Sequence, residues 1–86
     1  MRIEFDPAKN DANIAKHGLP LTFAARILVG SPTVVEDARQ DYGETRYQAY
    51  GVVAGRLHVC VYTVRGDAYR IISVRKANRR EVDAHR

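Results

Sequence analysis

The 86-residue chain contains one cysteine and no tryptophan. Cys60 has no second cysteine to pair with, so an internal disulfide is excluded, as is usual in a reducing compartment. One cysteine and three histidines also provide no spacing typical of metal ligands. We therefore expect a fold held by its apolar core, with no metal and no other cofactor.

Long apolar runs and glycine-rich phosphate loops are missing as well. No stretch approaches the roughly 20 apolar residues that a membrane-spanning helix needs. Acidic residues at Glu4 and Asp6 interrupt the region where a secretory signal places its hydrophobic segment. We expect a cytoplasmic protein without membrane association, and no nucleotide-binding loop or nucleophile elbow.

The charge that is present is unevenly distributed. The formal net charge is +4, yet residues 1–43 hold five Lys or Arg against six Asp or Glu. Residues 44–86 hold nine against four. Such a surplus in one half indicates a surface that meets a polyanion, although excess arginine could equally serve solubility.

Local signals predict two helices near the N-terminus. Asp6 before Pro7 is typical of a helix start and Gly18 of a helix end, which predicts a helix over 7–17. Apolar residues recur at helical spacing further along, which predicts a second helix over 21–29.

The rest of the chain has the pattern of strands separated by turns. Strands are expected at 2–5, from 33, and at 46–53, 56–64 and 68–75, with a polar loop over 37–44 and a last helix from Ala77 or Asn78. Two-residue turns at Ala54-Gly55 and Arg65-Gly66 would join the last three strands. This order predicts one α+β domain over 1–86, with an antiparallel sheet of about four to five strands, two N-terminal helices and one C-terminal helix.

Pairing through these turns predicts which side chains share a face of the sheet. An apolar face, packed on the helices, would carry Val52, Leu57, Val59, Val61, Ile72 and Val74. A solvent-facing side would carry Tyr47, Ala49, Gly51, His58, Cys60, Tyr62, Tyr69, Ser73 and Arg75, a mixture typical of a shallow binding surface. Arg70 falls on the apolar face without an evident role. A three-residue second turn would instead exchange the faces of the last strand.

Five separated motifs resemble BrnT toxins in order and spacing. They are Phe5-Asp6-Pro7-Ala8-Lys9-Asn10, Lys16-His17-Gly18, Glu36-Asp37-Ala38-Arg39 with Tyr42-Gly43-Glu44-Thr45-Arg46, Val61-Tyr62-Thr63, and Arg70 to Ala77 with Arg79-Arg80-Glu81. The resemblance implies a RelE-like ribonuclease fold and RNA cleavage that inhibits translation. It also implies neutralisation by a BrnA-like antitoxin whose ribbon-helix-helix part binds the DNA operator, so that the toxin meets DNA only through its antitoxin.

The chain departs from the family pattern in two places. The segment 20–25 is apolar where family members usually carry acidic residues, and Gln48 stands where an apolar strand residue is common. Neither departure touches the basic motifs. They affect the boundaries of the second helix and leave the predicted chemistry unchanged.

Metal-free RNA cleavage needs a base at the 2′-hydroxyl, cations at the phosphate and an acid at the leaving 5′-oxygen. Arginine suits the phosphate because its fixed fork matches two oxygens and its charge is permanent. We expect Arg75 to stabilise the transition state, with Arg46 also at the phosphate. His17 or Glu44 would move protons, although His17 could instead only cap its helix and Glu44 could only pair with Arg46.

The remaining RNA contacts are expected from residues of the basic motifs, namely Lys16, Tyr62, Arg70, Lys76, Arg79 and Arg80. Tyr62 could stack on an unpaired base, although strand tyrosines more often pack in a core. His58 and Cys60 are expected to be structural. Two other functions use the same features: a non-catalytic RNA-binding module, and a corepressor that binds an antitoxin and tightens its grip on DNA.

Overall fold

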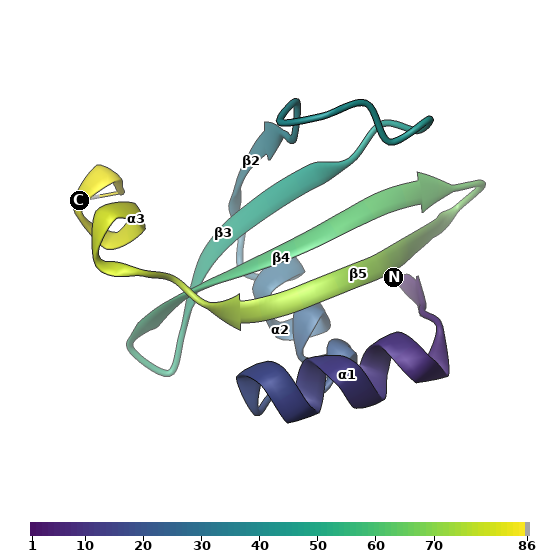
Figure 1. Cartoon of the computed structure of the whole chain (residues 1–86). Helices are drawn as coiled ribbons and strands as arrows, with labels where there is room; N and C mark the ends of the chain where they lie inside the picture. The colour runs from purple at the N-terminus through teal and green to yellow at the C-terminus, as the bar shows by residue number, and fades with distance from the viewer. Residues whose placement is uncertain (86) are drawn as a thin grey trace.

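The computed structural model describes residues 1–85, which form a single five-stranded sheet with helices on both faces (Figure 1). The elements are β1 (Arg2–Glu4), α1 (Pro7–His17), the 3-10 turn η1 (Leu21–Phe23), α2 (Ala24–Leu28), β2 (Thr33–Glu36), β3 (Tyr47–Val53), β4 (Arg56–Arg65), β5 (Ala68–Lys76) and α3 (Arg79–Ala84). Helices α1 and α2 lie on one face, and α3 lies over the opposite face near one end. No helix within residues 1–85 is long and apolar enough to cross a membrane.

The first helix begins and ends where its local signals predict. The Asp6 carboxylate accepts a hydrogen bond of 2.9 Å from the Ala8 amide, which satisfies a free N–H of the first turn. Gly18 ends the helix in the left-handed region (φ 73°) and donates its N–H to the Ile14 carbonyl. The predicted helix over 7–17 is therefore confirmed.

The second helix differs from its prediction. The segment expected as one helix over 21–29 starts as a 3-10 turn and is α-helical only from Ala24 to Leu28. No side chain caps its start, and the Leu21 amide instead donates to the Asn10 side chain of α1 at 2.8 Å. Leu21, Ala24 and Ile27 are fully buried, so this apolar segment fixes α2 against the sheet.

The sheet is mixed, whereas an antiparallel sheet was predicted. Its strand order is β1-β5-β4-β3-β2, and β1 runs parallel to β5 while the other pairs are antiparallel. The expectation failed at β1 because a three-residue strand carries no signal for its partner. The α+β class and the five strands are confirmed.

The two hairpin turns set the register of β3, β4 and β5. Ala54 and Gly55 both have positive φ (52° and 77°), as in the two-residue turn predicted there. The second turn is Gly66-Asp67, because Arg65 pairs with Ala68. The predicted turn at Arg65-Gly66 was one residue too early.

A β-bulge in β5 changes the face of the last residues of this strand. Val61 pairs with Ser73 but Tyr62 pairs with Ile71, so one residue is extra in β5. Arg70 lies opposite Thr63 and Arg75 lies opposite Val59. An odd spacing of five residues would separate the two arginines in a regular strand, but the bulge places both on one face.

The side of the sheet that was predicted to face solvent packs on the helices. Its core comprises Ala49, Val53, Cys60, Tyr62, Ile71 and Val74, together with Leu21, Ala24 and Ile27 from η1 and α2. The prediction was wrong because β4 is apolar on both sides: Val59 and Val61 on the other side are also buried. Gly51 also faces the helices, and its lack of a side chain lets α2 pack closely on the sheet. A Cβ at this position would lie only 3.2 Å from the Ile27 side chain.

The opposite side of the sheet, called the open face below, carries the polar and basic side chains. It comprises Gln48, Tyr50, Val59, Val61, Thr63, Arg70, Ser73 and Arg75, which the strand register places on one side. The predicted placement of Arg75 away from α1 and α2 is therefore right, although most of the neighbours predicted for it are wrong.

Asn13 joins α1 to the outer edge of β5. Strand β1 pairs only with residues 68–70, and beyond them the Asn13 amide donates to the Val74 carbonyl and accepts from the Val74 N–H, at 2.9 and 3.1 Å. Asn13 is buried, so these bonds replace a missing strand. The end of α1 is thereby fixed beside the end of β5.

Candidate functional site

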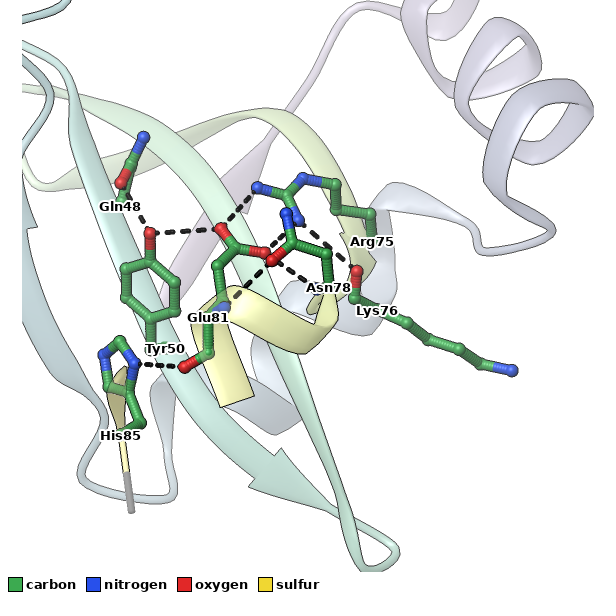
Figure 2. Close-up of polar contacts among 7 residues, drawn as sticks. All are labelled: Gln48, Tyr50, Arg75, Lys76, Asn78, Glu81 and His85. Carbon is green, nitrogen blue, oxygen red and sulfur yellow. Dashed lines mark hydrogen bonds and ion pairs between the residues drawn. The ribbon is translucent and has the colours of Figure 1, made fainter. Parts of the chain in front are cut away.

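Arg75 forms a shorter ion pair than the other arginines of the open face. Its Nη1 and Nη2 atoms lie 2.6 and 2.8 Å from the two carboxylate oxygens of Glu81 in α3. The Tyr50 hydroxyl lies 3.4 Å from the same carboxylate and donates to the Gln48 side chain at 2.8 Å. Figure 2 shows Arg75 from β5 and Tyr50 from β3 converging on Glu81. This bidentate geometry is the one that arginine uses for carboxylates and phosphates.

Glu81 is ionised at neutral pH in this arrangement. The hydrogen bonds from Arg75 lower the pKa of Glu81 to about 2, and the Asn78 amide assists. Glu81 also belongs to a capping box, in which it accepts from the Asn78 N–H while the Asn78 side chain accepts from the Glu81 N–H, both at 2.9 Å. The Glu81 carboxylate therefore both caps the start of α3 and binds the Arg75 guanidinium.

A loop before β3 brings a second arginine toward Arg75. The buried Asp37 carboxylate accepts from Nε and Nη2 of Arg39, both at 2.8 Å, and from the Tyr42 hydroxyl at 3.2 Å. These bonds lower the pKa of Asp37 to about 2. The pKa values of Tyr50 and Arg75 are raised overall, but the positive charge of Arg39 lowers both of them slightly. Arg39 is therefore close enough to interact electrostatically with both groups.

Arg39, Tyr50 and Glu81 were not among the predicted site residues. The motif Glu36-Asp37-Ala38-Arg39 already places an acid two residues before Arg39. Similarly, the spacing from Asn78 to Glu81 is that of a capping box. No sequence signal shows that Glu81 reaches back to Arg75, because that contact depends on the direction of the chain after β5.

Glu44, a predicted catalytic residue, lies toward the other end of the sheet from Arg75. Glu44 lies 3.3 Å from Arg46 and 3.8 Å from Arg65. Arg65 is six residues along β4 from Val59, the partner of Arg75, which is about 20 Å at the rise of a strand. Glu44 therefore lies away from Arg75 along the sheet, and it forms the ion pair with Arg46 that was the alternative role expected for it.

Arg46 lies nearer to Arg70 than to Arg75. It precedes Tyr47, which pairs with Tyr62, so Arg46 is close to the level of Thr63 and of Arg70 opposite it. This level is about 13 Å along the sheet from Arg75. The Arg46 guanidinium stacks on the Tyr42 ring at 4.0 Å, whereas Arg70 forms an ion pair of 3.7 Å with Glu4.

His17 and Lys16 are the last residues of α1, which lies on the opposite face of the sheet from Arg75. His17 lines a shallow cleft of about 230 Å³ between α1 and β5, whose other lining residues include Lys9, Lys16 and Ser73. Partial burial lowers the pKa of His17 below its usual value, and the charges of Lys16 and Arg75 lower it further. The side chain of His17 is therefore mostly neutral at neutral pH. It also lies close enough to Arg75 to interact with its charge.

Tyr62 cannot stack on a base in this structure. It is buried on the helix side of the sheet, with its ring centroid 5.4 Å from that of Tyr47 and 5.3 Å from that of Tyr69. The predicted RNA contact is wrong because the register turns Tyr62 into the core. The packing alternative is the observed one.

The other predicted RNA contacts are divided between surfaces. Lys76 pairs with His58 and so points away from the open face, and Arg79 and Arg80 lie exposed on α3. Arg79 forms an ion pair of 3.3 Å with Asp83. These three cations lie at or just after the end of β5, and their side chains do not share the Glu81 contact of Arg75.

His58 and Cys60 are structural, as predicted. His58 is buried, its Nδ1 lies 2.7 Å from the Arg56 carbonyl, and its ring packs on Phe23. Burial raises the pKa of the Cys60 thiol to about 12, which leaves it unreactive. Within residues 1–85, no three His, Cys, Asp or Glu side chains are grouped so that they could hold a metal.

These features define a small α+β domain whose open sheet face carries arginines at both ends, one of them in a bidentate contact with a carboxylate. The model of the family described as "Ribonuclease toxin, BrnT, of type II toxin-antitoxin system" matches residues 5–81. The chain therefore belongs to the BrnT family of ribonuclease toxins, and membership of a type II system implies a protein antitoxin as its partner. No curated protein matches the sequence.

Proposed function

We propose that the chain is a metal-independent endoribonuclease that cleaves RNA by attack of the 2′-hydroxyl, leaves a 2′,3′-cyclic phosphate and thereby inhibits translation. The observation that carries this proposal is the Arg75 guanidinium, which already holds two anionic oxygens at 2.6 and 2.8 Å on the open face. A scissile phosphate offers the same pair of acceptors. Family membership supports the ribonuclease activity.

The geometry supports separate roles for the cations and the histidine. Arg75, with the charge of Arg39 nearby, would stabilise the extra negative charge of the transition state. His17 is mostly neutral at neutral pH, so it is suited to accept the 2′-hydroxyl proton. Lys16 would contact an adjacent phosphate from the same cleft.

The distant arginines would hold the RNA chain away from the scissile bond. Arg70 and Arg46 lie about 13 Å along the open face from Arg75 and can contact phosphates further along the strand. The exposed cations Lys76, Arg79 and Arg80 would add attraction for RNA at the other end.

We further propose a BrnA-like antitoxin with a ribbon-helix-helix part as the partner, and binding to operator DNA only through that antitoxin. Expression of the chain alone should arrest bacterial growth, and co-expression of such an antitoxin should restore it. Normal growth with soluble toxin present would contradict the toxic activity.

Chelation tests the reaction most simply. The purified protein should cleave single-stranded RNA in excess EDTA, and the 5′ fragment should end in a 2′,3′-cyclic phosphate. Loss of cleavage in EDTA with recovery in Mg²⁺ would contradict the mechanism. RNA that is bound but never cut would support the non-catalytic RNA-binding alternative.

A further inference from the structure

Helix α3 is held on the open face by few contacts. None of its residues from Arg79 to Ala84 is buried. Glu81 bonds to Arg75 and Tyr50, and the His85 ring stacks on Tyr50 with centroids 4.3 Å apart. A cleft of about 420 Å³ lies beside it, lined by residues that include Val52, Leu57 and Val82. The helix therefore covers the face without packing closely on it.

The connection between β5 and α3 has the properties of a hinge. Ala77 is buried and its N–H donates to the Leu57 carbonyl at 2.9 Å, so the chain is fixed up to this residue. The capping box links Asn78 only to Glu81, within the helical segment itself. Because the cap would travel with the helix, α3 can leave the sheet without losing its first turn.

Glu81 fills the position of a bound anion. Its two oxygens accept from Nη1 and Nη2 of Arg75, and its Oε2 lies within reach of the Tyr50 hydroxyl. A phosphate group presents oxygen acceptors to a guanidinium fork in the same way. An RNA phosphate and Glu81 cannot occupy this position of Arg75 at the same time.

We propose that Arg75 and Tyr50 form a phosphate-binding site that Glu81 occupies in the resting fold, and that an RNA phosphodiester displaces Glu81 together with α3. The identity of this ligand rests on the proposed ribonuclease function, whereas the anion site itself does not. RNA must then compete with an internal carboxylate. The apparent affinity of the site is its intrinsic affinity multiplied by the fraction of molecules in which α3 has moved away.

Inorganic phosphate tests the site directly. It would be titrated into the full chain while NMR follows the backbone amide signals of β3 and β5, in the parent, in Glu81→Gln and in Asp83→Asn. Glutamine at position 81 keeps an acceptor for the capping box but removes the charge. Asp83→Asn is the matched control, because it removes one negative charge from the same helix while leaving Glu81 in place.

Glu81→Gln should bind phosphate about tenfold more tightly than the parent, or better, if α3 leaves the site in at most about a tenth of molecules. Asp83→Asn should gain little. The added variant Arg75→Gln, made in the Glu81→Gln background, should abolish the gain and so locate it. Equal gains in Glu81→Gln and Asp83→Asn would show a general charge effect and overturn the proposal.

A second substitution guards against local effects of glutamine. Glu81→Ala, which also removes the capping acceptor, should bind phosphate at least as tightly as Glu81→Gln, with circular dichroism reporting that the sheet is intact. Weaker phosphate binding by both variants than by the parent would mean that Glu81 positions Arg75 for anions, which contradicts the proposal.

RNA cleavage measured on the same proteins separates this proposal from the proposed function. Phosphate gain in Glu81→Gln with no cleavage of RNA by any variant would refute the ribonuclease and retain the occupied anion site. Cleavage by the parent with no gain in Glu81→Gln would retain the ribonuclease and refute the blocking role of Glu81.

Discussion

The two ends of the open face hold their arginines in different ways. At the end covered by α3, Arg75 makes a bidentate pair at 2.6 and 2.8 Å. At the other end, the ion pair of Arg46 with Glu44 spans 3.3 Å and that of Arg70 with Glu4 spans 3.7 Å. All three side chains are exposed to a similar extent, between 24% and 29%, so burial does not explain the difference.

The difference suits the two ends of the open face to different tasks. A guanidinium held by two hydrogen bonds, within electrostatic range of a neutral histidine, suits charge stabilisation and proton transfer at one phosphate. Loosely paired arginines can adjust to phosphates of a flexible strand, and such contacts add affinity without placing the reacting atoms. We therefore expect the Arg75 end to determine the rate and the Arg70 end to determine binding.

The largest effect is expected at the Arg75 end. Arg75→Ala should lower the rate of RNA cleavage by about 10²–10³, because one preorganised donor to the transition state is lost. Stability should fall by only about 1 kcal/mol, since the ion pair is partly exposed. Arg2→Ala removes an arginine whose pair with Asp67 is more exposed and serves as the control. A stable Arg75→Ala protein that cleaves at the parent rate would remove Arg75 from the site.

His17→Gln should lower cleavage by about 10², the lower range for a group that transfers protons. In the parent, cleavage should rise with pH until His17 has lost its proton and then level off. Because the pKa of His17 is lowered, the midpoint of this rise should lie below pH 6.5. His17→Gln should lack that rise, and a rise that persists in the variant would assign it to another group.

A smaller effect is expected from the loop that carries Arg39. Asp37→Asn should lower cleavage by about tenfold, because Arg39 loses the carboxylate that positions it. It should also lower the melting temperature, since Asp37 is buried. Arg39→Ala should reproduce the loss of cleavage with a smaller loss of stability. If Arg39→Ala cleaves normally, Asp37 only stabilises the loop.

Acid should destabilise the fold through Asp37 and Glu81. Both have a pKa of about 2, below the usual values of 3.8 and 4.5, so their ionised forms stabilise the native state. That contribution is complete above about pH 5 and is lost as the pH falls toward 2. Chemical denaturation across this range should show a shallower decline for Asp37→Asn than for the parent, and parallel curves would contradict the assignment.

The elements were predictable because their signals are local. The first helix carries its own start and stop in Asp6, Pro7 and Gly18, and the strands β3 to β5 follow from apolar stretches between turns. The pairing of β1 and the faces of the sheet were not predictable. A short strand does not specify its partner, and the apolar residues of β4 lie on both sides.

The site was predictable only in part, for the same reason. Arg75 and His17 could be selected as residue types suited to the chemistry, and the structure brings them within electrostatic range. The bulge opposite Val61 and Tyr62 places Arg70 on the same face as Arg75, yet it leaves no pattern in the sequence. Glu44 lies at the other end of the sheet from Arg75 and Tyr62 lies in the core, because their positions depend on register and not on local composition.

Single-turnover cleavage combined with RNA binding, measured for Arg75→Ala and Arg70→Ala on the same single-stranded RNA, tests the central claim most directly. Arg75→Ala should lose about 10²-fold or more in the rate at saturating protein with little loss of affinity. Arg70→Ala should bind more weakly and with a shallower salt dependence, yet should cleave bound RNA at nearly the parent rate. Equal losses of rate in both variants would contradict the division between the two ends.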